Sequence, residues 1–171
     1  SFFYWYNIYT KEHFINHDST DALVDHPITN DDYSYSSPNW WAREMRDVKL
    51  AGIDFIAPVY WGVPGYDSWS FQGVVKMVEA YDIMAKAGET PPKIGLFYDT
   101  STLQHNPSGT HVDLSTPEGK QWFYNTIRDY FSLIPPHMWA MIDGRPIIFL
   151  YSAAFAKKQD PKALEYVYES F

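Results

Sequence analysis

The stretch PPKIGLFYDTS, residues 91–101, passes directly from an apolar run into an acid followed by two hydroxyl residues. The run KIGLFY shows no polar alternation, which is typical of a strand buried on both faces between helix layers. Asp99 at its end has two interpretations. Its carboxylate either caps a turn, or it stands at the C-terminal end of a parallel strand, where α/β proteins keep their binding sites.

Three other apolar runs have the same character: FFYWYN at residues 2–7, IDFIAPVYW at 53–61 and PIIFLYS at 146–152. We predict that all four are strands. Proline cannot donate to a strand ladder, so Pro58 predicts a bulge or an early end to pairing. The dipeptide Asp143-Gly144 between apolar residues predicts a tight hairpin turn before the last strand.

Helical patterns fill the intervals between these runs. Ser37 and Pro38 predict the start of a helix that stops at Gly52, and a second helix is expected over residues 70–88. Thr116 before Pro117 predicts the start of a third, and Asp160 before Pro161 the start of a fourth. Alternating strands and helices imply a parallel sheet with right-handed crossovers.

The sequence therefore predicts one α/β domain over residues 1–171, with about four βα units and parallel strands. We prefer the N-terminal portion of a (β/α)8 TIM barrel, an incomplete barrel, over a small open sheet. Long segments follow the strands and short ones follow the helices, which places a site at the C-terminal face. An unrelated flavodoxin-like domain is the alternative, but neither GxGxxG nor GxxxxGK[ST] occurs.

Composition narrows the ligand class. The net charge is -8, with 13 Lys and Arg against 21 Asp and Glu, so we expect no nucleic-acid partner. No apolar run reaches the roughly eighteen residues of a membrane span. The absence of cysteine excludes disulfides and thiolate chemistry, and no cofactor is expected. A start at Ser1, with a strand already begun, leads us to expect an exported protein in an extracellular or periplasmic location.

The first long loop is rich in possible metal ligands, but their spacing is irregular. We therefore interpret it as a solvated polar loop, predict no metal site, and keep only His26, before Pro27, as a ligand-facing imidazole. The residues considered are His13, His17, Asp18, Asp21, Asp25 and His26.

Aromatic residues make up 19% of the chain. Aromatic rings serve cores first, but a ring exposed in a cleft can hold the apolar face of a sugar. The rings that stand beside polar loop residues are Tyr60, Trp61, Tyr66 and Trp69.

Together these segments resemble the N-terminal half of glycoside hydrolase family 99, the endo-α-mannosidase and endo-mannanase family, and related family-99-like and family-71-like domains. FFYWYN is similar to the family's opening FYxWYG strand, and DHP to the histidine-proline element of its first loop. EMRDVKLAGIDFIAPVYWG is similar to the helix and strand that end in SWY or SWWG. PPKIGLFYDTS parallels the strand that ends in HIEPY, and DGRPIIFLYS parallels GKPLFYIYDS.

Two departures limit what the resemblance carries over. Residues 97–101 read FYDTS, so the histidine and second tyrosine of HIEPY are lost and its glutamate becomes Asp99. The family's catalytic acid pair lies in an asparagine-glutamate-tryptophan-x-glutamate segment, and nothing in this sequence matches it. No catalytic residue is assigned, and Asp99 is only a weak candidate.

The resemblance implies a barrel that binds a glycan or polysaccharide and, in a full-length protein, hydrolyses its glycosidic bonds. The alternative is a non-catalytic carbohydrate-binding or self-assembling surface protein. In either case, the incomplete barrel could pair with the remainder of its own barrel or with another copy of the chain. The residues expected to line the sugar site are Trp5, Tyr6, His26, Tyr60, Trp61 and Asp99.

Overall fold

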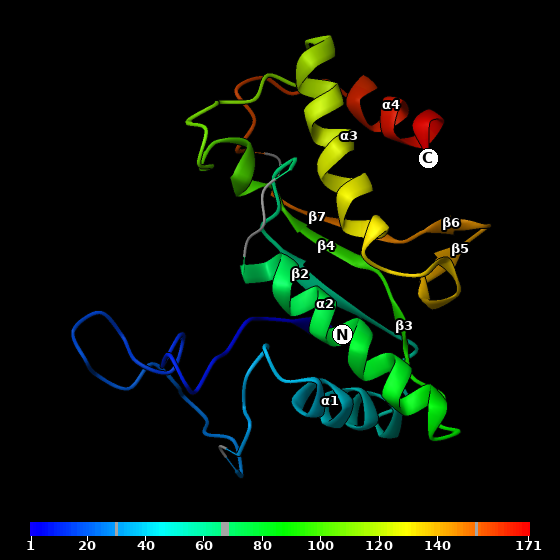
Figure 1. Cartoon of the computed structure of the whole chain (residues 1–171). Helices are drawn as coiled ribbons and strands as arrows, with labels where there is room; N and C mark the ends of the chain where they lie inside the picture. Colours follow the sequence, from blue (N-terminus) through cyan, green and yellow to red (C-terminus); the bar gives the residue numbers. More distant parts are fainter. Residues whose placement is uncertain (30, 66–68, 153) are drawn as a thin grey trace.

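The sheet consists of parallel strands that pair in the order in which they follow one another along the chain (Figure 1). This computed structural model describes residues 1–29, 31–65, 69–152 and 154–171. The sheet strands are β1 (Phe2–Phe3), β2 (Phe55–Tyr60), β4 (Leu96–Asp99) and β7 (Ile148–Tyr151), with β3 (Lys93–Ile94) also pairing with β2.

The strand order β1-β2-β4-β7 differs from that of doubly wound sheets, in which the order reverses at a switch point. The predicted parallel sheet is confirmed, and its order is consistent with part of a barrel. Within the described ranges the sheet does not close, because β1 and β7 form its two edges.

The sheet is strongly curved. Neighbouring strands lie about 4.8 Å apart, so the first and fourth strands of a flat sheet would be about 14 Å apart. The rings of Phe2 on β1 and Phe149 on β7 nevertheless have centroids only 5.2 Å apart. Phe2 also contacts Phe97 of β4, at 4.7 Å. These rings lie together on one face of the sheet, which is therefore its concave face.

Two helices begin where their capping residues predict. The Ser37 side chain accepts a hydrogen bond from the Trp40 N–H, and that of Thr116 accepts one from Gly119. The fourth helix begins one residue later than predicted, because Pro161 and not Asp160 stands at its N-cap; the Asp160 carboxylate accepts the Lys162 N–H at 3.0 Å. The four helices are α1 (Pro38–Leu50), α2 (Trp69–Lys86), α3 (Pro117–Ser132) and α4 (Lys162–Ser170), and the short 3-10 turns are η1 (Thr100–Leu103) and η2 (Pro136–Met138).

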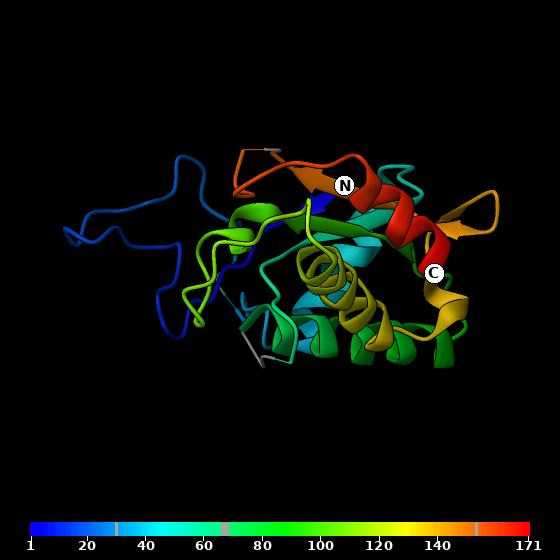
Figure 2. The same cartoon turned by 90° about the horizontal axis from the view of Figure 1, so that it is seen from above.

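The strands are shorter than the apolar runs. Strand β1 covers only Phe2–Phe3 of the predicted 2–7, since the chain then leaves the sheet for its first long loop. This loop, drawn in blue, projects away from the rest of the molecule in both views (Figures 1 and 2). The predicted hairpin is confirmed as β5 (Met141–Ile142) and β6 (Arg145–Pro146), with Asp143 and Gly144 at positive φ.

Pro58 interrupts the ladder without ending its strand. The Gly95 N–H donates to the carbonyl oxygen of Ile56 at 2.8 Å. In a regular parallel ladder the next donor to the Gly95 carbonyl would be the N–H of residue 58, which proline lacks. The buried hydroxyl of Tyr130 donates to that oxygen instead, at 2.7 Å. A side chain of α3 thus completes the hydrogen bonding of the sheet.

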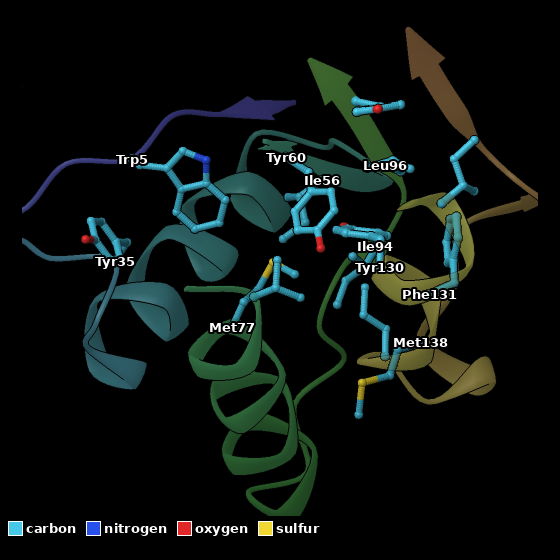
Figure 3. Packing of buried hydrophobic residues seen from close by; sticks show 14 of the residues in the cluster. Trp5, Tyr35, Ile56, Tyr60, Met77, Ile94, Leu96, Tyr130, Phe131 and Met138 are labelled. Carbon is cyan, nitrogen blue, oxygen red and sulfur yellow. The ribbon is translucent and has the colours of Figure 1, made fainter. Parts of the chain in front are cut away.

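The core lies between the sheet and the helices (Figure 3). Figure 2 shows α2 and α3 on one side of the sheet. Packing is tight where α2 crosses Trp5, because a Cβ added at Gly73 would lie 2.2 Å from the Trp5 ring. Only glycine allows this approach. The largest fully buried side chains include Trp5, Trp40, Trp41, Tyr60, Tyr98 and Tyr130.

Candidate functional site

A cluster of rings lies at the carboxyl ends of β1 and β2. The Tyr4 ring meets the Trp61 ring edge-on, with centroids 5.3 Å apart and an interplanar angle of 87°. The His13 imidazole lies 4.6 Å from the Tyr4 ring and 5.9 Å from that of Tyr6. Tyr4 is 43% exposed, while the other three side chains are half-buried. The cluster thus exposes part of the Tyr4 ring, which the Trp61 and His13 rings contact.

A hollow of about 820 Å3 opens beside Tyr4 and Tyr6. Rings form part of its wall, and the first long loop supplies polar groups. This combination suits a ligand with both apolar faces and hydroxyl groups. The lining residues from the loop are Thr10, Lys11, Glu12, His13, Ile15, Asn16, His17 and Ala22.

The loop is shaped by backbone pairing and by two residues with left-handed backbone. The Asn7 and Glu12 backbones exchange hydrogen bonds of 3.2 and 3.1 Å. Lys11 and His13 have φ angles of 60° and 62°, which non-glycine residues rarely adopt. Such strained residues concentrate at functional sites, where the surrounding structure holds them.

The His13 ring is oriented by the backbone. Its Nδ1 contacts the carbonyl oxygen of Trp5. A carbonyl oxygen only accepts hydrogen bonds, so Nδ1 carries the proton, and Nε2 of the neutral ring is an acceptor. Such an acceptor beside Tyr4 and Tyr6 can receive a hydrogen bond from a ligand hydroxyl.

Two carboxylates influence the cluster. Partial burial raises the pKa of the Tyr4 hydroxyl, and the charges of Asp99 and Glu12 contribute to the increase. Glu12 also accepts a hydrogen bond of 3.1 Å from the Tyr35 hydroxyl. Tyr4 is neutral near pH 7, as tyrosines ordinarily are, so its hydroxyl can donate to a ligand or accept from it.

The structure shows the capping role of Asp99, and Asp99 is not among the residues that line the hollow. It is the last residue of β4, and its carboxylate accepts the Ser101 N–H at 3.0 Å, capping η1. Only 8% of Asp99 is exposed. The structure therefore makes it a capping residue whose charge also reaches Tyr4.

Two residues expected to line the site lie elsewhere. Trp5 is fully buried, and its indole N–H donates to the carbonyl oxygen of Val59. Tyr60 is 1% exposed, and its ring lies 5.0 Å from that of Tyr130. Both point to the helix-covered face of the sheet, so we correct the expectation that they line an open cleft. Successive residues of an extended chain point in opposite directions, which leaves Tyr4 and Trp61 at the ring cluster.

His26 lies apart from the hollow's lining and is exposed. Its Nε2 lies 2.5 Å from a carboxylate oxygen of Asp21, at hydrogen-bond distance. Tyr66 falls outside the described residues. The residues that sequence reasoning did not select are Tyr4, Glu12 and His13. For Tyr4 the sequence did contain a signal. Neighbouring residues of an extended segment point in opposite directions, so a buried Trp5 places Tyr4 on the opposite face.

Across the described ranges, no group of three or more His, Asp or Glu side chains is arranged to hold a metal ion. Within those same ranges, no helix has the length and apolar character needed to cross a membrane.

The family described as Domain of unknown function (DUF5010) matches the chain over residues 1–171. The chain belongs to this family. A comparison with curated proteins finds no match. The DUF5010 chain is similar in structure to the GH99 endo-alpha-mannosidase from Bacteriodes thetaiotaomicron, solved with BIS-TRIS-propane, with a TM-score of 0.51 and 17% sequence identity.

The structural match covers 92% of the DUF5010 chain and 42% of the mannosidase chain. At this level of identity the similarity shows a shared glycoside-hydrolase-like fold, as the sequence resemblance led us to expect. The chain thus spans less than half the length of the mannosidase that it resembles.

Proposed function

We propose that this chain binds carbohydrate in the hollow beside Tyr4. The observation that carries the proposal is the contact of Tyr4 with both Trp61 and His13, at the carboxyl ends of two parallel strands. Sugars have apolar C–H faces that pack on aromatic rings and hydroxyl groups that need polar partners. The hollow offers both kinds of surface within one space.

Each polar group has a distinct part in the proposed binding. His13 Nε2 accepts from a sugar hydroxyl, because Nδ1 is committed to the Trp5 carbonyl. Lys11 also lines the hollow and provides a donor for a sugar hydroxyl. The fold shared with an endo-alpha-mannosidase supports a neutral oligosaccharide as the ligand class.

Hydrolysis is a further proposal for a protein that contains this region. Glycosidases need two carboxyl groups flanking the scissile bond. In the part of the chain that the structure describes, Asp99 caps η1 and Glu12 is hydrogen-bonded to Tyr35. Both acids have hydrogen-bonding roles within the fold, and we assign catalysis to neither of them. The chain's proposed contribution to such an enzyme is to hold the sugar.

Isothermal titration with a panel of α-mannan and β-glucan oligosaccharides tests the proposal. We expect saturable binding, and Tyr4→Ala should weaken it about ten-fold, since a well-packed aromatic contact is worth roughly 1–2 kcal/mol. Tyr9→Ala is the matched control, because Tyr9 is 66% exposed on the same loop but does not line the hollow. A folded protein that binds none of these sugars, or equal losses in both variants, would overturn the proposal.

A further inference from the structure

Asn7 is a buried polar residue at the point where the chain leaves the sheet for its first long loop. It follows the aromatic run of residues 2–6, and only 7% of it is exposed. Burying a side-chain amide costs free energy unless its polar atoms are hydrogen-bonded. The partners of the Asn7 side chain therefore indicate what this residue holds in place.

The side-chain oxygen of Asn7 joins the two ends of the loop. Its Oδ1 accepts the Tyr9 N–H at 3.1 Å and the hydroxyl of Ser34 at 3.0 Å. A backbone N–H only donates, so the atom that faces it is the amide oxygen. Ser34 is itself fully buried. One oxygen thus links the segment that leaves the sheet to the segment that returns to it.

The turn that begins at Asn7 ends at residues of the hollow. A side-chain oxygen that accepts the N–H two residues on bends the chain into a turn. The backbone pairing of Asn7 with Glu12 closes residues 8–11 within that turn. Lys11 and His13, on either side of Glu12, have the left-handed backbone described above. All three residues line the hollow, so their placement depends on this turn.

A second contact ties the returning segment to the same turn. The hydroxyl of Tyr35, the residue after Ser34, donates to Glu12 Oε2 at 3.1 Å. Tyr35 is buried, and its ring lies 5.7 Å from that of Trp5, so the core fixes this hydroxyl. A carboxylate has acceptor sites for further hydrogen bonds. Glu12 and His13 thus offer acceptors from consecutive residues, which suits a ligand with neighbouring hydroxyl groups.

We propose that Asn7 is a positioning residue of the carbohydrate site, because its side-chain oxygen holds the turn that brings residues 11–13 to the hollow. The inference rests on the proposed function and names the residue that organises its polar groups. Asn7 is not among the residues that line the hollow, so it acts through these neighbours. Groups that are held in place before a ligand arrives lose less conformational freedom when it binds.

NMR spectra of the His13 ring nitrogens test this role without any ligand. In the intact turn Nδ1 donates to the Trp5 carbonyl, so the neutral ring should show a single tautomer at about pH 8. Asn7→Ala removes the oxygen, and both tautomers should then appear. Asn7→Asp keeps an acceptor oxygen at the same place and should retain the single tautomer. A single tautomer in Asn7→Ala, or both tautomers in Asn7→Asp, would overturn the proposal.

Titration calorimetry with the same oligosaccharides tests the effect on binding. Asn7→Ala should weaken binding about five- to ten-fold, and Asn7→Asp less than about two-fold. Thr116→Ala is the control for lost stability, because it removes a helix cap outside the lining of the hollow. It should lower the unfolding temperature by about 2–4 °C and leave the affinity unchanged. Equal losses of affinity in Asn7→Ala and Thr116→Ala would show a merely structural role.

The two measurements separate this inference from the proposed function. If the unaltered protein binds none of the sugars, the proposed function fails, and the tautomers of His13 still decide whether Asn7 orients the segment. If the unaltered protein binds sugar and Asn7→Ala changes neither the affinity nor the tautomer, the positioning role fails and the proposed function stands.

Discussion

The Tyr130 hydroxyl donates a 2.7 Å hydrogen bond to the carbonyl oxygen of Gly95, at the one point where Pro58 cannot donate to the ladder. The sheet therefore depends on a helix for one of its own hydrogen bonds. Tyr130 is fully buried, so neither partner can turn to water instead. This contact links the third helix to the two central strands.

We expect Tyr130→Phe to lower the free energy of unfolding by about 1–3 kcal/mol, because it leaves the buried Gly95 carbonyl without a donor. Urea denaturation measures the change. Tyr124→Phe is the control, since the Tyr124 hydroxyl donates to the Ser170 carbonyl at an exposed position and its loss should cost under about 1 kcal/mol. Equal losses of stability in the two variants would show that the buried hydrogen bond to Gly95 contributes no more than the exposed one.

Stability should fall above pH 10. Burial raises the pKa of the Tyr98 and Tyr130 hydroxyls above the usual value. Below about pH 10 both residues are protonated in the folded and unfolded states alike. At higher pH the unfolded chain releases these protons and the folded chain keeps them, so folding becomes less favourable by about 1.4 kcal/mol per pH unit for each residue.

Denaturant titrations at pH 9, 10 and 11 measure this slope. Tyr98→Phe should make the decline of the unfolding free energy with pH less steep by the contribution of one tyrosine, about 1.4 kcal/mol per pH unit. Tyr168→Phe alters a tyrosine that is 61% exposed and serves as the control. A slope that Tyr98→Phe leaves unchanged contradicts the prediction.

Gly73→Ala should be destabilising even though alanine is the better helix former by about 1 kcal/mol. The added methyl group would lie 2.2 Å from the Trp5 ring, and overpacking of this kind costs about 1–3 kcal/mol. Thermal unfolding gives the difference. Combining it with Trp5→Leu provides room, so the double variant should lose less than the sum of the two single losses.

His13→Ala should weaken oligosaccharide binding about ten-fold, because the hollow loses its oriented hydroxyl acceptor. His26→Ala should leave binding unchanged, since His26 is not among the residues that line the hollow. Titration calorimetry of both variants distinguishes the two histidines. The reverse order of effects would move the site to the outer part of the loop.

Asp99→Asn and Asp99→Ala separate charge from capping. The Asn amide oxygen can still accept the Ser101 N–H, so unfolding should change little, whereas Ala loses the cap and about 1 kcal/mol. If the carboxylate also supports the ligand, Asn should weaken oligosaccharide binding about ten-fold. Unchanged affinity in the stable Asn variant would remove Asp99 from the site.

Helix starts were predictable because their signals are local. A hydroxyl residue followed by proline, as at Ser37-Pro38 and Thr116-Pro117, satisfies the first N–H groups wherever the helix lies in the fold. Strand extents were less predictable, because pairing depends on distant segments. Residues 4–6 are aromatic like Phe2–Phe3, yet only Phe2 and Phe3 pair with β2.

The site was only partly predictable for a related reason. Alternation along an extended segment separates Trp5 from Tyr4 and Tyr60 from Trp61, but every one of these residues is aromatic. Sequence alone does not say which of two aromatic faces the helices cover. The packing of α2 against Trp5 decides it, and that contact joins residues 68 positions apart.

The order of the strands also bears on how the chain folds as it is made. Each strand of the sheet after β1 pairs with a strand that precedes it in the chain, so each emerging βα unit finds a partner already synthesised. Reversed strand orders instead require early strands to wait for later ones. We therefore expect folding to advance from the N-terminus in step with translation, with rates that depend on closing one crossover at a time.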